Sequence, residues 1–160
     1  MRVVVAAVGR LKSGPEQELV ARYADRTKKS GKPVGITSLE LVEIPESRAN
    51  TADQRKDEEA ETLLAKLGPN PHIFAFDERG KNGSSPEFAR EIKAALDAGN
   101  GELVFIIGGP DGLAQSMRDK AKQIVSFGKL TMPHQLVRVL VLEQIYRATT
   151  ILTNHPYHRE

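Results

Sequence analysis

Short apolar runs alternate with helix-length segments along the whole chain. The run at 2–8 (RVVVAAV) is β-branched and almost continuously apolar, which is typical of a strand buried on both faces of a sheet. Comparable runs predict further strands at 38–44, 72–77, 102–107 and 123–127. Helices are predicted between and after these strands, at 15–29, 51–67, 85–98, 114–122 and 135–152. The alternation predicts one α/β domain over residues 1–160, with a mainly parallel sheet and helices on both faces.

Turn and capping residues mark where these segments begin and end. Pro15 is typical of a first helical turn, and Thr51 with Gln54 forms the pattern of a capping box. Glycine-containing turns are predicted at 78–83, before the third helix, and at 99–101, after it. No internal repeat and no long linker divides the chain, which favours a single domain.

The predicted last helix is apolar on most of its sides. A helix that lies on one face of a sheet needs an apolar stripe only about 100° wide. The excess predicts a second packing partner, most simply a second copy of the chain in a homodimer.

Composition narrows the class of protein. Apolar residues make up 39% of the 160 residues and charged residues 28%, which excludes a disordered chain. The absence of cysteine excludes a disulfide scaffold, a zinc–thiolate site and a cysteine nucleophile. No apolar run approaches the ~20 residues of a membrane span, and no secretory signal precedes the first strand. We therefore expect a cytoplasmic protein with no membrane partner.

The charge balance leaves an RNA partner open. The sequence has 23 basic and 21 acidic side chains, a net charge of +2, whereas proteins that hold nucleic acid by charge alone are usually far more basic. From Arg118 onward basic residues outnumber acidic ones, and this segment holds three of the four histidines.

The first candidate for chemistry is the segment 105–112, where a strand runs into Gly-Gly-Pro-Asp-Gly. Ligands of open parallel sheets bind beyond the carboxyl ends of strands, and Gly108 and Gly109 would let the backbone approach a ligand. A tight turn without function is the alternative. The spacing matches neither a P-loop nor a dinucleotide-binding motif.

The second candidate is the segment 128–134, just before the last helix. Gly128 and Pro133 bracket a short apolar loop that suits the edge of an adenine or sugar pocket, with His134 at the helix start. A plain loop with a structural histidine is the alternative.

The third candidate is the tail, 153–160 (TNHPYHRE). His155 and His158 form an H-x-x-H pair, but without a third nearby ligand we predict no metal site. Tyr157 and the histidines suit stacking on RNA bases, and Arg159 suits a phosphate. An ordinary polar terminus remains the alternative.

Three segments together resemble a known family. The stretches 107–112 (IGGPDG), 131–138 (TMPHQLVR) and 153–160 (TNHPYHRE) are similar to signatures of the ribosomal RNA large subunit methyltransferase H family, in the SPOUT class of knotted methyltransferases. Two departures are visible: Phe76 where leucine is expected, and Gln135 where proline is expected.

This resemblance implies methyl transfer from S-adenosylmethionine to N3 of a pseudouridine in 23S rRNA, on the assembled ribosome. It also implies a deep carboxyl-terminal trefoil knot and a homodimer in which each active site borrows residues from the partner. The cofactor would contact Phe76, Gly108, Gly109, Gly128, Lys129, Leu130, Thr131, Met132 and Pro133. The catalytic candidates are His134, Arg138, His155, Tyr157, His158 and Arg159; the histidines are candidates for a general base and the arginines for stabilising an anion or holding phosphate. The alternative function is a non-enzymatic, ribosome-associated module that binds a nucleotide or RNA.

Overall fold

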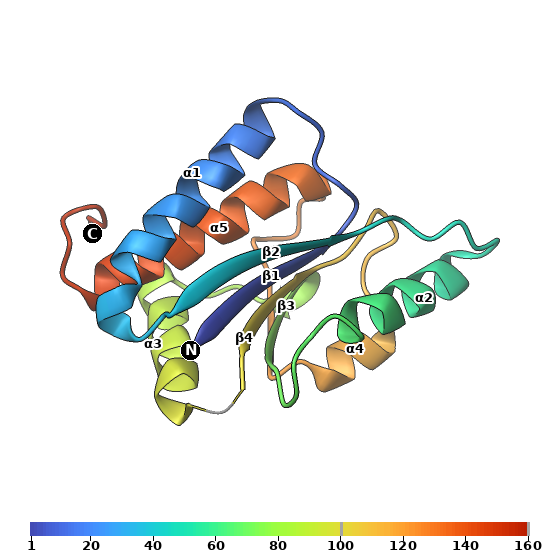
Figure 1. Ribbon diagram of the computed structural model, residues 1–160. Helices are drawn as coiled ribbons and strands as arrows, with labels where there is room; N and C mark the ends of the chain where they lie inside the picture. Colours follow the sequence, from blue (N-terminus) through green and yellow to red (C-terminus); the bar gives the residue numbers. More distant parts are fainter. Residues whose placement is uncertain (100, 160) are drawn as a thin grey trace.

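The computed structural model describes residues 1–99 and 101–159, and it has a five-stranded sheet at its centre (Figure 1). The strands are β1 (Arg2–Val8), β2 (Ser38–Ile44), β3 (His72–Lys81), β4 (Leu103–Ile107) and β5 (Gln123–Val125). They lie in the order β2-β1-β4-β3-β5, and every neighbouring pair is parallel. A parallel sheet needs crossover connections, which the intervening helices provide.

The sheet is buried on both faces because its central strands are apolar on both faces. Side chains of β1 from Val3 to Val8 are at most 1% exposed, and those of β4 at most 2%. Within the pairing of β1 and β4, Val3 lies opposite Leu103 and Ala7 opposite Ile107. These two strands therefore end at the same level, and the chain leaves both at one edge of the sheet.

The helices divide into two layers (Figure 1). On one face lie α1 (Pro15–Ser30), α3 (Ser85–Ala98) and α5 (His134–Leu152), and on the other lie α2 (Ala52–Leu64) and α4 (Gln115–Lys120). Each layer has its own apolar core, one around Phe74 and Phe105 and one around Val104 and Met117. This arrangement confirms the predicted α/β fold with helices on both faces.

Predicted boundaries hold to within a few residues, except at the end of β3. A turn was expected at 78–83, but β3 continues to Lys81, which pairs with Val125 after a register shift that begins at Phe76. Gly80 permits this continuation, since a Cβ there would lie 2.6 Å from the carbonyl oxygen of Ile124. The expected turn at 99–101 contains Asn100, and the tail motif ends in Glu160; both residues lie outside the described part of the chain.

Helix α5 lies between α1 and α3 and packs against both. Most of its apolar side chains are therefore covered within one chain, so its composition by itself does not require a second copy. Two exceptions lie one turn apart near its start: Leu136 is 45% exposed and Leu140 36%. Across the described residues, no helix combines the length and apolar character that a membrane span needs.

Candidate active site

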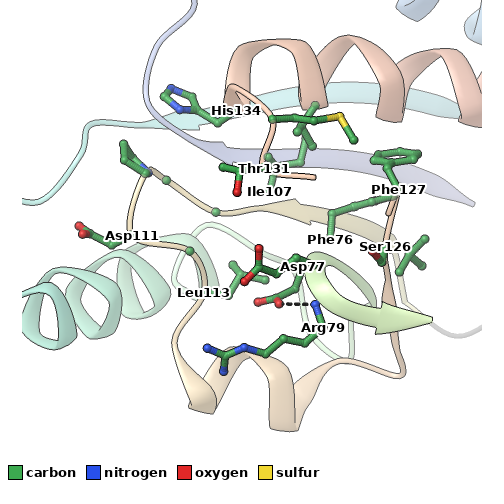
Figure 2. A pocket seen from close by; sticks show the side chains of 18 of the residues that line it. Phe76, Asp77, Arg79, Ile107, Asp111, Leu113, Ser126, Phe127, Thr131 and His134 are labelled. Atoms are coloured by element: carbon green, nitrogen blue, oxygen red, sulfur yellow. Dashed lines mark hydrogen bonds between the residues drawn. The ribbon is translucent and has the colours of Figure 1, made fainter. Parts of the chain in front are cut away.

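A cavity of about 800 Å³ lies at the carboxyl ends of the central strands. Figure 2 shows it between the middle of β3, with Phe76 and Asp77, the loop after β4, with Asp111, and the entry to α5, with Thr131 in the loop and His134 as the first residue of the helix. Ligands of open α/β sheets bind at this edge, and the volume is in the range of pockets for small molecules and cofactors.

One part of the cavity is apolar and aromatic. Phe76 and Phe127 stack with their ring centroids 5.2 Å apart and their planes 18° from parallel. Ile107, Leu113 and Val137 also line the cavity. Such a surface can hold a flat ring system.

Another part of the cavity is charged. Asp77, directly after Phe76 in β3, forms an ion pair with Arg118 of α4 at 3.1 Å. Both residues line the cavity, and their side chains are only 9% and 11% exposed. Sequence reasoning missed this pair; the only signal was an acidic residue directly following a buried strand.

Most of the predicted cofactor residues lie together in this cavity. Its lining includes Phe76, Gly108, Gly109, Gly128, Leu130, Thr131, Met132 and Pro133. Lys129 is exposed and is not among the lining residues. The loop is held at its start by Ser126, whose hydroxyl accepts from the Gly128 N–H and donates to the Gly128 carbonyl, both at 3.0 Å.

The two adjacent glycines serve the packing of their own loop. A Cβ on Gly108 would lie 2.9 Å from the backbone of Gly112, and one on Gly109 would lie 2.9 Å from Cγ1 of Val8. Both positions are occupied by protein atoms, so the absence of a side chain lets the loop lie close to the sheet. The sequence predicts that these glycines let the backbone approach a ligand; the close contacts that the structure describes at both positions are with protein atoms.

The predicted catalytic residues of α5 are placed differently from each other. His134 lines the cavity and lies beside Gly9, whose Cβ position is 3.4 Å from the His134 Nε2. Arg138 is 2% exposed and does not line the cavity. Its guanidinium pairs with Glu43 and donates to the carbonyl oxygens of Val8, at 3.2 Å, and Gly9, at 2.9 Å.

These contacts give Arg138 a structural position. It joins α5 to the ends of β1 and β2, and burial lowers the pKa of its guanidinium while Glu43 opposes that shift. Arg138 therefore fixes the strand ends beneath His134.

The tail folds back on the outer side of α5. Tyr157 donates from its hydroxyl to Glu143 at 3.0 Å, and its ring lies 4.7 Å from that of Tyr146. The guanidinium of Arg147 lies 4.9 Å from the Tyr157 ring centre and pairs with Glu143 at 2.6 Å. Burial, with the neighbouring Glu143, raises the pKa of the Tyr157 phenol. Glu143 and Arg147 are therefore parts of the tail cluster that sequence reasoning missed.

The remaining tail residues differ in their exposure. His158 is half-buried, with Nδ1 3.4 Å from Nη1 of Arg147, while Nε2 is buried without a hydrogen-bond partner among the described residues. His155 and Arg159 are exposed. No group of three or more potential metal ligands occurs in the parts of the chain that the structure describes.

The tail leaves α5 at the end opposite the cavity and folds back to the middle of the helix, at Glu143. The 19 residues of α5 correspond to about 28 Å at the rise of an α-helix. Figure 1 shows α5 beginning near the carboxyl ends of the strands, with the tail leaving its other end. Tyr157 reaches back only as far as Glu143, nine positions from His134. Within one chain, His155, Tyr157, His158 and Arg159 are therefore not among the residues that line the cavity.

Comparison with known proteins shows the family to which this chain belongs. The family model described as "Predicted SPOUT methyltransferase" matches residues 1–158. A protein of Xanthobacter autotrophicus named ribosomal RNA large subunit methyltransferase H is 52% identical over 159 residues, 99% of each chain. Proteins of the same name from Methylorubrum populi and Bradyrhizobium diazoefficiens are 52% identical over 160 residues and 51% over 159; the aligned parts cover 99% of this chain and 97% and 99% of theirs. The chain belongs to the SPOUT methyltransferase family.

Proposed function

We propose that this protein transfers a methyl group from S-adenosylmethionine to N3 of a pseudouridine in 23S rRNA. Relatives at about half identity over nearly the full chain carry the name of a large-subunit rRNA methyltransferase. The observation that carries the proposal is the cavity, because most of the residues that the resemblance assigned to the cofactor line it together. Membership of a methyltransferase family favours this function over a non-enzymatic binding module.

The residues present fit S-adenosylmethionine. The aromatic pair Phe76 and Phe127 suits the adenine, and the charged pair Asp77 and Arg118 lies in the same cavity. When bound, this cofactor supplies a sulfonium-activated methyl group, so the protein's main tasks are alignment and control of the acceptor's proton.

The chain's own residues suit these tasks. The loop 128–133 and the loop after β4 both contribute residues to the lining of the cavity. His134 is the one predicted general-base candidate that lines the cavity. An imide nitrogen is a poor nucleophile until it loses its proton, so an imidazole at the entrance is suitably placed to accept that proton. Arg138 acts in this account as a positioning residue.

A second copy of the chain would bring the tail to the cavity. Leu136, Leu140, Glu143 and Arg147 recur at the spacing of one helix face. If two copies of α5 cross antiparallel about Leu140, the Glu143–Arg147 segment of one copy lies opposite the first turn of the other. The partner's Tyr157, His158 and Arg159 would then lie at the cavity entrance. We propose this homodimer because a two-fold contact buries the exposed leucines and completes the site in one step.

The proposal also covers the form of the RNA substrate and the knot at the carboxyl terminus. The net charge of only +2 favours a structured surface of the assembled ribosome in the cytoplasm over free RNA held by charge. The carboxyl-terminal segment is proposed to form the trefoil knot of the family, with the loops around the cavity as its crossing segments.

The experiment is methyl transfer from radiolabelled S-adenosylmethionine to 70S ribosomes, 50S subunits and free 23S rRNA, each prepared without this modification. We expect incorporation into 70S particles, with the label at a pseudouridine N3 when the digested RNA is analysed by mass spectrometry. Cofactor binding without incorporation into any of the three substrates would favour the non-enzymatic module.

A further inference from the structure

The ion pair of Asp77 and Arg118 has an environment that its role in folding does not explain. Asp77 ends the buried part of β3 and Arg118 belongs to α4, a helix of only six residues. Both side chains are about nine-tenths buried, yet both line the cavity. A buried ion pair commonly contributes no more stability than well-packed apolar residues, because both charges lose their hydration. A buried ion pair that also lines a cavity is therefore better explained by a ligand.

The hydrogen bonds of this pair leave capacity for that ligand. Nη1 of Arg118 donates to Asp77 Oδ2 at 3.1 Å and to the carbonyl oxygen of Leu113 at 2.5 Å. Nε of Arg118 is buried and has no partner among the described residues. Asp77 Oδ1 accepts from the N–H of Arg79 at 2.9 Å, and each carboxylate oxygen has a further lone pair. The pair therefore has a donor on Arg118 and acceptor positions on Asp77 that the hydrogen bonds within the protein leave unused.

The other charged residues of the cavity are less suited to this task. Lys56 is paired with Asp53 at 2.8 Å. Asp111 is held by Arg55 through two hydrogen bonds, Nε to Oδ2 at 2.7 Å and Nη2 to Oδ1 at 3.1 Å. Glu78 and Arg79 are exposed, so bulk water competes with any ligand there. Figure 2 shows Asp77 on the side of the cavity opposite Thr131 and His134.

We propose that Asp77 and Arg118 bind the amino-acid part of S-adenosylmethionine, with Arg118 donating to its carboxylate and Asp77 accepting from its ammonium group. This inference rests on the proposed cofactor and adds the subsite that holds its zwitterionic end. The adenine then lies toward Phe76 and Phe127, because the aromatic pair and the charged pair are joined by consecutive residues of β3, Phe76 and Asp77. The subsite distinguishes adenosyl compounds that carry the amino acid from those that lack it.

The experiment compares two ligands in calorimetric titrations. S-adenosylhomocysteine carries the ammonium and carboxylate groups, and 5′-methylthioadenosine lacks both while keeping the adenosine and the sulfur. We expect the native protein to bind S-adenosylhomocysteine more tightly. In Arg118→Gln, that preference should fall by about 10- to 100-fold, the range for a lost charge-assisted hydrogen bond, while affinity for 5′-methylthioadenosine stays within a few-fold.

Two further variants control for the effects of an unpaired buried charge and of losing an arginine elsewhere. Asp77→Asn with Arg118→Gln removes both charges while keeping two polar side chains. It avoids an unpaired buried carboxylate and should show the same loss of preference. Arg2→Gln is the matched control, since Arg2 pairs with the 5%-exposed Glu102 at 2.7 Å, at the opposite edge of the sheet. It should leave the preference unchanged.

The outcomes separate this inference from the proposed function. The subsite would be overturned if Arg118→Gln lost affinity equally for both ligands, or if the double variant kept the native preference. Either result would leave the proposed cofactor unaffected. If the native protein binds neither adenosyl compound, the cofactor proposal itself is wrong and the subsite falls with it.

Discussion

The hydroxyl of Tyr157 donates a 3.0 Å hydrogen bond to Glu143, fourteen positions earlier in the chain. Glu143 also pairs with Arg147, which lies over the Tyr157 ring. The tail is therefore held against the outer side of α5 by a cluster of three side chains. Because that side also carries the exposed Leu136 and Leu140, the tail and the proposed dimer contact form one continuous surface.

Deleting residues 157–160 should separate cofactor binding from catalysis. The cavity is lined by residues of β3 and of the loops before α4 and α5 and by none of the tail residues that the structure describes, so affinity for S-adenosylmethionine should remain within a few-fold. Methyl transfer to ribosomes should be lost, because stacking and cationic side chains suit a nucleotide. Both quantities are measured on a purified variant shown to be dimeric. Full activity of this variant would rule out a function for the tail.

Replacing Leu140 by glutamate should yield a monomer. Leu140 is 36% exposed, so the fold tolerates the charge, whereas a two-fold contact would place two such charges together. Sedimentation should give the mass of one chain, with cofactor affinity kept and methyl transfer lost. Thr62→Glu is the control, because it adds the same charge to an exposed position of α2, on the opposite face of the sheet. A dimeric, active Leu140→Glu variant would contradict the proposed contact.

Gly109→Ala should lower cofactor affinity by displacing its loop. The added Cβ would lie 2.9 Å from Cγ1 of Val8, and such overpacking typically costs about 1–3 kcal/mol of stability. Val8→Ala removes the clashing atom, so the double variant Gly109→Ala with Val8→Ala should regain cofactor affinity. If affinity is not regained, the space at Gly109 is needed by something other than Val8.

Glu59 should make stability depend on pH. It is 5% exposed, and burial raises its pKa although the N–H of Ser47 opposes the shift; Asp111 and Glu46 add to the rise. A carboxyl group whose pKa is raised by folding binds more protons in the folded protein than in the unfolded chain. The stability that it contributes in its protonated form is therefore lost as the pH rises through its pKa in the folded protein. Glu59→Gln should therefore be more stable than the native protein at pH 8. The difference in unfolding free energy between the two proteins should shrink as the pH is lowered toward the ordinary pKa of glutamate.

Urea unfolding at several pH values measures this effect. Glu61→Gln, an exposed position on the same helix, should show no such trend. A Glu59→Gln variant that is less stable at pH 8 would mean that the carboxylate is stabilised by its surroundings.

The sequence predicts an element correctly where that element depends only on residues close together in the chain. The continuous β-branched run of β1 and the capping box of Thr51 and Gln54 correspond to observed elements, and the capping box is present with both hydrogen bonds. The continuation of β3 to Lys81 was not predictable, because it depends on pairing with Val125, forty-four positions later. The same limit applies to Arg138. Its charge suggested catalysis, while its burial against Glu43 and two carbonyl groups depends on where three elements meet.

The site shows the same division. The segments around Gly108 and Gly128 drew attention through glycine and proline, and they line one cavity. Asp77 and Arg118 lie 41 positions apart, and Glu143 looked like an ordinary polar position of a helix. Their functions in this account arise from proximity that only the fold provides.

The most direct test of the central claim, that one active site is built from two chains, is complementation in mixed dimers. Thr131→Trp fills the cavity from an exposed lining position, and the deletion of 157–160 removes the tail; each homodimer should be inactive. In a co-expressed mixture, each mixed dimer pairs one intact cavity with the partner's intact tail. With random assortment, methyl transfer to ribosomes should return to about a quarter of the native rate. Purified mixed dimers that bind S-adenosylmethionine but transfer no methyl group would contradict the two-chain site.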